Sequence, residues 1–161
     1  MDNAGTTFGT LICYESLFGD YTRTLVHQGA EFLVVLAQDG WWGRSAGYLQ
    51  HFALTRLRAI ETRRAVVMST VTGRSGLIHP DGSAPVTTDW MERTVHHASV
   101  PLLQAPTVYV LHGDWVGRGA LILSLLLGLT WAFLTLFYPR RRDPKGRRKA
   151  SNVQLVKVRH T

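Results

Sequence analysis

Residues 119–138 form an uncharged run of twenty residues, which limits how this chain can fold more than any other feature. At about 1.5 Å of rise per residue, a helix of this length spans roughly 30 Å, the hydrocarbon thickness of a bilayer. Trp115 and Tyr138 flank the run, as aromatic residues do at membrane interfaces. We therefore predict a transmembrane helix over residues 119–138.

Charge is divided unevenly along the chain. Residues 1–138 hold nine basic and ten acidic residues, whereas residues 139–161 hold nine basic residues and one acid. By the positive-inside rule, we expect this basic tail in the cytoplasm and the residues before the helix on the opposite, periplasm-like side. A nucleic-acid partner is disfavoured, because the tail has no interleaved aromatic residues.

Three mostly apolar segments predict strands of an α/β domain, residues 8–14, 32–37 and 65–70, and residues 93–100 could form a last strand. Residues 32–37 are apolar without interruption, which is typical of a strand buried on both faces. Leu77 and Ile78 lead into a Pro-Asp-Gly turn, which predicts a hairpin with a partner near Val86.

Two helices are expected between these strands. The first covers residues 21–28, with Asp20 as its cap. The second covers residues 48–62, where apolar side chains recur at spacings of three and four. They predict one buried stripe made of Leu49, Phe52, Ala53, Leu57 and Ile60.

Cys13 is the only cysteine and lies where the first predicted strand meets a polar turn. It could be a small buried hydrophobe or the nucleophile of an acyl-transfer enzyme. Glu15 could orient the thiol, but a thiol with a pKa of about 8.5 also needs a cation or a base for activation. None of the seven histidines stands out as that partner. No metal-site spacing is present, so we expect no metal and no cofactor.

Trp41 and Trp42 lie in a glycine-rich loop that follows the strand at 32–37. Two interpretations of this pair are equally open. The rings could cover the end of the sheet, or they could form a mobile lid over an apolar substrate.

Several segments together resemble a known family. Residues 11–18, Leu-Ile-Cys-Tyr-Glu-Ser-Leu-Phe, resemble the nucleophile region of the nitrilase, or carbon-nitrogen hydrolase, superfamily. Residues 39–43, 47–52 and 58–64 are similar to one branch of it, the apolipoprotein N-acyltransferases. Soluble amidases of the superfamily lack both the paired-tryptophan loop and a following membrane helix.

The resemblance implies an α/β fold that is part of a nitrilase-like α-β-β-α sandwich. Residues 1–105 would be the C-terminal half of the catalytic domain, and residues 106–118 a linker to the membrane. The transmembrane helix at 119–138 and the basic tail at 139–161 would complete the chain. The implied location is the bacterial inner membrane, with the catalytic domain on the periplasmic side.

The resemblance also implies an activity. Such an enzyme moves an acyl chain from a phospholipid onto cysteine as a thioester, then onto the α-amino group of diacylglyceryl-cysteine in a bacterial lipoprotein. Cys13 matches the nucleophile and Glu15 a neighbouring carboxylate. The main-chain N–H of Tyr14 would help to hold the oxyanion. Trp41 and Trp42 match an aromatic loop near the acyl entrance.

One departure from the family is important. Its catalytic Glu and Lys lie before the cysteine, and residues 1–12 contain neither. We therefore expect this 161-residue chain to be inactive alone. Two alternatives stay open: a membrane-tethered amidase in which water accepts the acyl group, and a non-catalytic half-domain that pairs with a separate N-terminal half.

Overall fold

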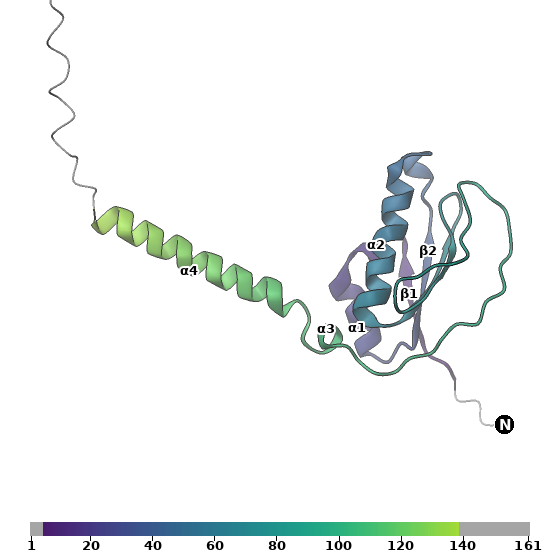
Figure 1. Ribbon diagram of the computed structural model, residues 1–161, viewed down its shortest axis with the longest axis horizontal. Coiled ribbons are helices and arrows are strands. Elements are labelled where there is room, and N and C mark those ends of the chain that lie inside the picture. The colour runs from purple at the N-terminus through teal and green to yellow at the C-terminus, as the bar shows by residue number, and fades with distance from the viewer. Residues whose placement is uncertain (1–4, 139–161) are drawn as a thin grey trace, which may run out of the picture. The chain divides into compact units, whose positions relative to one another are not determined.

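A computed structural model describes residues 5–138 of the chain (Figure 1). The chain divides into two compact units, the first of which ends at Gly117. Two longer helices and four strands build most of the first unit: β1 (Phe8–Ile12), α1 (Gly19–His27), β2 (Phe32–Ala37), α2 (Ala46–Thr62), β3 (Ala65–Thr70) and β4 (Gly76–Ile78). Three short helices complete it: the 3-10 turns η1 (Cys13–Leu17) and η2 (Gly40–Trp42), and α3 (Val108–His112).

The four strands form one sheet in the order β1-β2-β3-β4. β1, β2 and β3 are parallel, and β4 runs antiparallel to β3. The bounds predicted for β2 and β3 are confirmed, whereas β1 ends two residues earlier because Cys13 begins η1. Since parallel strands end at a common edge, the residues that follow β1, β2 and β3 converge there.

The two faces of the sheet differ in burial. Core side chains of the sheet lie on the face against α1 and α2 and are at most 1% exposed: Leu11, Leu33, Val35, Val66 and Met68. On the opposite face, Phe8 and Ile12 are each 54% exposed. Leu36 is also exposed, so the prediction that residues 32–37 are buried on both faces is wrong. Within the first unit, no helix or second sheet formed by residues 5–117 covers that part of the sheet.

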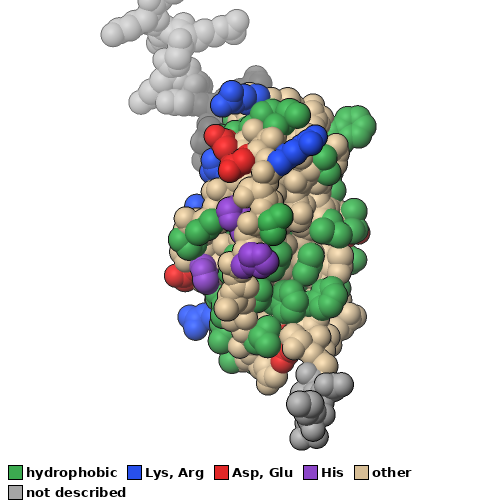
Figure 2. Space-filling model, turned by 90° about the vertical axis from the view of Figure 1, so that its right-hand side faces the viewer, with side chains coloured by type: hydrophobic (Ala, Val, Ile, Leu, Met, Phe, Trp, Pro, Cys, Tyr) green, Lys and Arg blue, Asp and Glu red, His purple; other side chains and the backbone are tan. Residues whose placement is uncertain are grey.

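Apolar side chains are numerous on one side of the molecule, where Figure 2 shows them with histidines among them. α2 also has exposed apolar side chains. Of the predicted stripe only Phe52 is buried, and Leu57 and Ile60 are nearly half exposed. The buried side of α2 instead carries Thr55 and Thr62, whose hydroxyls donate to main-chain carbonyls of their own helix. Polar side chains whose hydrogen bonds are satisfied in this way can be buried. The spacing of apolar residues alone therefore does not reveal the buried side of the helix.

Other boundaries also differ from expectation. Asp20 lies in the first turn of α1, whose cap is Phe18. Residues 93–100 form no strand; only three of the eight residues are apolar, and most of the segment lines a cavity beside β3 and β4. The predicted hairpin is reduced to β4 and a single bridge between Gly76 and Thr87.

The described residues include one helix that is long and apolar enough to cross a membrane, α4 (Trp115–Phe137). It begins four residues before the predicted span. The predicted basic tail, residues 139–161, lies outside the described residues.

Candidate active site

Cys13 lies in a strained turn at the end of β1, here called the cysteine turn (residues 12–16). Its φ of +51° places it in the left-handed region, which costs a residue with a Cβ about 1–2 kcal/mol. Two hydrogen bonds fix the main chain on either side. The Ile12 N–H donates to Glu15 Oε2 at 2.7 Å, and the Ser16 hydroxyl donates to the Cys13 carbonyl at 2.9 Å. The turn thus holds a partly exposed thiol at the carboxyl edge of the sheet.

Glu15 is tied to the main chain of this turn. Its carboxylate accepts the Ile12 N–H, so at least one of its oxygens stabilises the backbone conformation that Cys13 requires. Bonds from main-chain N–H groups to a charged carboxylate are among the stronger hydrogen bonds in proteins. From the sequence, Glu15 could orient the Cys13 thiol. In the structure, its carboxylate accepts a hydrogen bond from the N–H of Ile12, the last residue of β1.

Replacing Glu15 with alanine is expected to lower the free energy of unfolding by about 1–2 kcal/mol, because the Ile12 N–H loses a charged acceptor. Glu15→Gln keeps an acceptor oxygen and is expected to lose less than half as much. Chemical denaturation followed by tryptophan fluorescence measures both variants. Equal losses in the two variants would contradict a role in holding the turn.

The paired tryptophans occupy different surroundings. The Trp42 ring meets the Tyr14 ring edge-on, with centroids 5.5 Å apart, and lies 5.6 Å from the His51 ring. Trp41 is 83% exposed. The structure therefore brings Trp42 and Tyr14 together beside Cys13, and leaves Trp41 pointing into solvent.

A chain of buried polar side chains lies behind the cysteine turn. Asp39 Oδ1 lies 2.8 Å from His51 Nδ1, and His51 Nε2 lies 2.8 Å from Ser16 Oγ. None of these three residues is more than 2% exposed. We call Asp39, His51 and Ser16 together the buried relay. Thr55 supports it by donating to the His51 carbonyl at 3.0 Å.

Sequence reasoning missed the relay because it treated the seven histidines alike. Two signals could have found it. Asp39 is the second residue after the end of β2, so it reaches the same edge of the sheet as Cys13. His51 is spaced three or four residues from Tyr48 and Thr55 on the buried side of α2.

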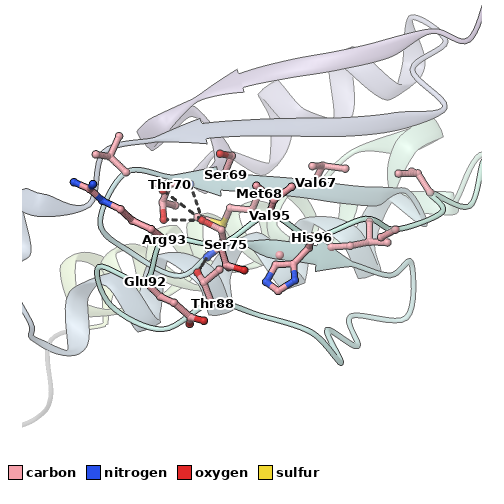
Figure 3. Close-up of a pocket in the computed structure, with 16 residues that line it drawn as sticks. Val67, Met68, Ser69, Thr70, Ser75, Thr88, Glu92, Arg93, Val95 and His96 are labelled. Carbon is pink, nitrogen blue, oxygen red and sulfur yellow. Dashed lines mark hydrogen bonds between the residues drawn. The ribbon is translucent and has the colours of Figure 1, made fainter.

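A cavity of about 750 Å³ lies between β3, β4 and the segment after Thr88. Figure 3 shows Thr70 and Ser75 joined by hydrogen bonds, with Arg93 and Glu92 towards one end and His96 towards the other. Cys13 is not among the residues that line it. Within residues 5–138, no group of three or more His, Cys, Asp or Glu side chains could hold a metal ion.

Comparison with known proteins identifies the family. Residues 1–106 match the carbon-nitrogen hydrolases. The chain belongs to the carbon-nitrogen hydrolase family. It is therefore a member of an enzyme family with a nitrilase-like fold of mixed sheet and helices, as the resemblance of the cysteine segment implied.

Curated relatives of this carbon-nitrogen hydrolase chain carry a more specific name, apolipoprotein N-acyltransferase. The protein from Chlorobaculum tepidum is 37% identical, with 81% of this chain and 25% of that protein covered. The Thermotoga maritima protein is 31% identical, with 84% and 26% covered. For Gloeobacter violaceus the identity is 34%, with 88% and 25% covered. The resemblance to this branch is confirmed, and the chain spans about a quarter of the length of these relatives.

Proposed function

We propose that this carbon-nitrogen hydrolase chain is part of an apolipoprotein N-acyltransferase. The observation that carries the proposal is Cys13, held in a left-handed turn at the carboxyl end of a parallel strand. Similarity to N-acyltransferases over four fifths of the chain supports the choice of reaction. An amidase would use the same thiol, but the relatives named apolipoprotein N-acyltransferase favour acyl transfer to an amine.

The reaction would proceed in two acyl transfers. The Cys13 thiolate attacks an ester carbonyl of a phospholipid, the acyl C–O bond breaks, and a lysophospholipid leaves after its alkoxide takes up a proton. The free amine of a lipoprotein diacylglyceryl-cysteine then attacks the thioester. The C–S bond breaks, the amine loses a proton, and the thiol is restored.

Each site residue has a proposed task. Cys13 is the nucleophile, and the main-chain N–H of Tyr14 stabilises the oxyanion. Glu15 holds the turn and stands beside the thiol. Trp42 lines the approach to Cys13, and the exposed ring of Trp41 contacts the lipid acyl chain.

The resemblance implies that the general base and the oxyanion cation come well before Cys13, and residues 1–12 contain neither a Glu nor a Lys. We propose that residues outside this 161-residue sequence supply them, and that the sequence alone transfers no acyl chain. This requirement fits a chain that spans a quarter of its relatives.

We further propose that α4 anchors the chain in the bacterial inner membrane, with the first unit on the periplasmic side and the tail in the cytoplasm. Replacing Leu126 and Leu127 by arginine puts two charges near the middle of α4, at roughly 2.5–3.5 kcal/mol each on the insertion scale. The variant is expected to leave the membrane pellet on carbonate extraction. The matched control, isoleucine at both positions, is expected to stay there, and retention of the arginine variant would contradict membrane insertion.

Acyl loading tests the proposed function directly. The full-length protein, as expressed in cells, is incubated with phospholipid vesicles. It is then analysed by intact mass spectrometry and peptide mapping. We expect one acyl chain on Cys13, removable by hydroxylamine and transferable to a diacylglyceryl-cysteine peptide. Hydrolysis of a short amide without any turnover of phospholipid would instead establish the amidase alternative.

A further inference from the structure

The buried relay has the connectivity of a Ser-His-Asp triad, but its hydroxyl cannot meet a substrate. Ser16 is fully buried, and its Oγ lies between His51 Nε2 at 2.8 Å and the Cys13 carbonyl at 2.9 Å. The relay therefore ends on the main chain of the cysteine turn. Any influence on chemistry must pass through the peptide that joins Cys13 to Tyr14.

That peptide links two groups of the proposed site. The Cys13 carbonyl and the Tyr14 N–H belong to one rigid plane and point in opposite directions. Fixing the carbonyl with the Ser16 hydroxyl therefore also fixes the direction of the N–H. A donor on the carbonyl also polarises the amide, which strengthens its N–H as a hydrogen-bond donor.

The Ser16 hydroxyl has a single proton, so it can donate that proton to only one partner at a time. When His51 carries both ring protons, it donates to Asp39 and to Ser16, and Ser16 donates to the Cys13 carbonyl. When His51 carries only the Nδ1 proton, Nε2 becomes an acceptor and competes for the Ser16 proton. The protonation of His51 thus decides which partner Ser16 holds.

We propose that Asp39, His51 and Ser16 are positioning residues that orient the Tyr14 N–H towards the oxyanion through the Cys13 carbonyl. This inference rests on the proposed role of Cys13 as the nucleophile. The groups that face His51 are the Asp39 carboxylate from the loop after β2, the Tyr14 and Trp42 rings, and the Ser16 hydroxyl. Asp39 is the charged group among them.

Two reactions of the same thiol separate positioning from general damage. Acylation by a p-nitrophenyl ester passes through a tetrahedral oxyanion, whereas alkylation by iodoacetamide does not. We measure both rates at Cys13 by mass spectrometry, in the protein at its cellular length and in its native membrane. The ratio of acylation to alkylation reports on the oxyanion donor, and the alkylation rate reports whether the turn is intact.

Ser16→Ala is expected to lower the ratio roughly tenfold or more, because the Tyr14 N–H is no longer fixed. The matched control is Thr62→Val, which removes another buried hydroxyl bonded to a main-chain carbonyl, that of Arg58 at 2.7 Å. We expect the control to leave the ratio unchanged. Equal ratios in Ser16→Ala and the wild type would overturn the proposal.

Replacing His51 adds a readout that a merely structural role would not move. His51→Leu is expected to lower the ratio because Ser16 Oγ loses its partner at 2.8 Å, and His51→Gln, which keeps a polar side chain, is expected to restore part of it. A wild-type protein that is alkylated but never acylated, or labelling of Ser16 by a fluorophosphonate, would also overturn the proposal. If acylation by the ester depends on the relay but no acyl chain is loaded from phospholipid, the positioning role of the relay is supported and the phospholipid substrate is refuted.

Discussion

Replacing Cys13 with alanine or glycine is expected to abolish acyl transfer, a loss of about a thousandfold or more, because no other thiol exists in the chain. The loss should appear as an absence of hydroxylamine-sensitive acyl adduct on this segment. It should also appear as an absence of N-acylated lipoprotein peptide. Both products are measured by mass spectrometry of the protein at its cellular length.

The two replacements are expected to differ in stability although both are inactive. Cys13 has a φ of +51°, a conformation that glycine adopts freely and alanine does not. Cys13→Gly should therefore be about 1 kcal/mol more stable than Cys13→Ala by chemical denaturation. This comparison separates chemistry from folding, because the more stable variant still lacks the nucleophile.

Two outcomes would contradict this account. Residual acyl transfer by Cys13→Gly would place the nucleophile elsewhere. A glycine variant less stable than the alanine variant would mean that the turn is not strained at this position.

Replacing Arg64 with methionine is expected to give the largest loss of stability, about 3 kcal/mol. Arg64 is 3% exposed, and its guanidinium donates to five main-chain carbonyls at 2.9–3.4 Å: those of Ala30, Thr62, Arg63, Gln104 and Ala105. Burial lowers the pKa of Arg64, although a guanidinium remains charged at neutral pH. Methionine fills the space of the side-chain stem but leaves these carbonyls without their donor.

The loss of stability in Arg64→Met should also appear locally, in the segment that Arg64 contacts. Since Arg64 joins β3 to the segment that contains Gln104 and Ala105, limited proteolysis of that segment should accelerate in Arg64→Met. Arg44→Met, at an exposed position in the loop before α2, is the matched control and should change neither property. An unchanged denaturation midpoint in Arg64→Met would show that the carbonyls find other donors without cost.

The parts of the fold that follow from local patterns were predictable. The apolar segments of β2 and β3 have the bounds expected from their sequences, because β-branched runs between turns have few alternatives. The burial of α2 was not predictable from its apolar spacing, since His51, Thr55 and Thr62 occupy its buried side. Their burial depends on hydrogen bonds to partners that are visible only in three dimensions.

The candidate site, like the fold, could be predicted from the sequence only in part. The Trp42 ring packs against the ring of Tyr14, the residue that follows Cys13. Trp41 does not join them, because η2 turns the two adjacent rings into different surroundings. The relay could not be predicted from residue counts, since Ser16, Asp39 and His51 lie up to 35 residues apart and meet only at the sheet edge.

The hydrogen bonds that shape the cysteine turn all come from one stretch of the sequence that precedes α4. Residues between Ile12 and Thr55 supply every side chain of the turn and its relay. Translation at roughly 5–20 residues per second then needs about 3–12 s more to reach Trp115, the first residue of α4. The bonding partners of the turn are thus synthesised well before the membrane helix, so insertion of α4 is not a precondition for assembling them.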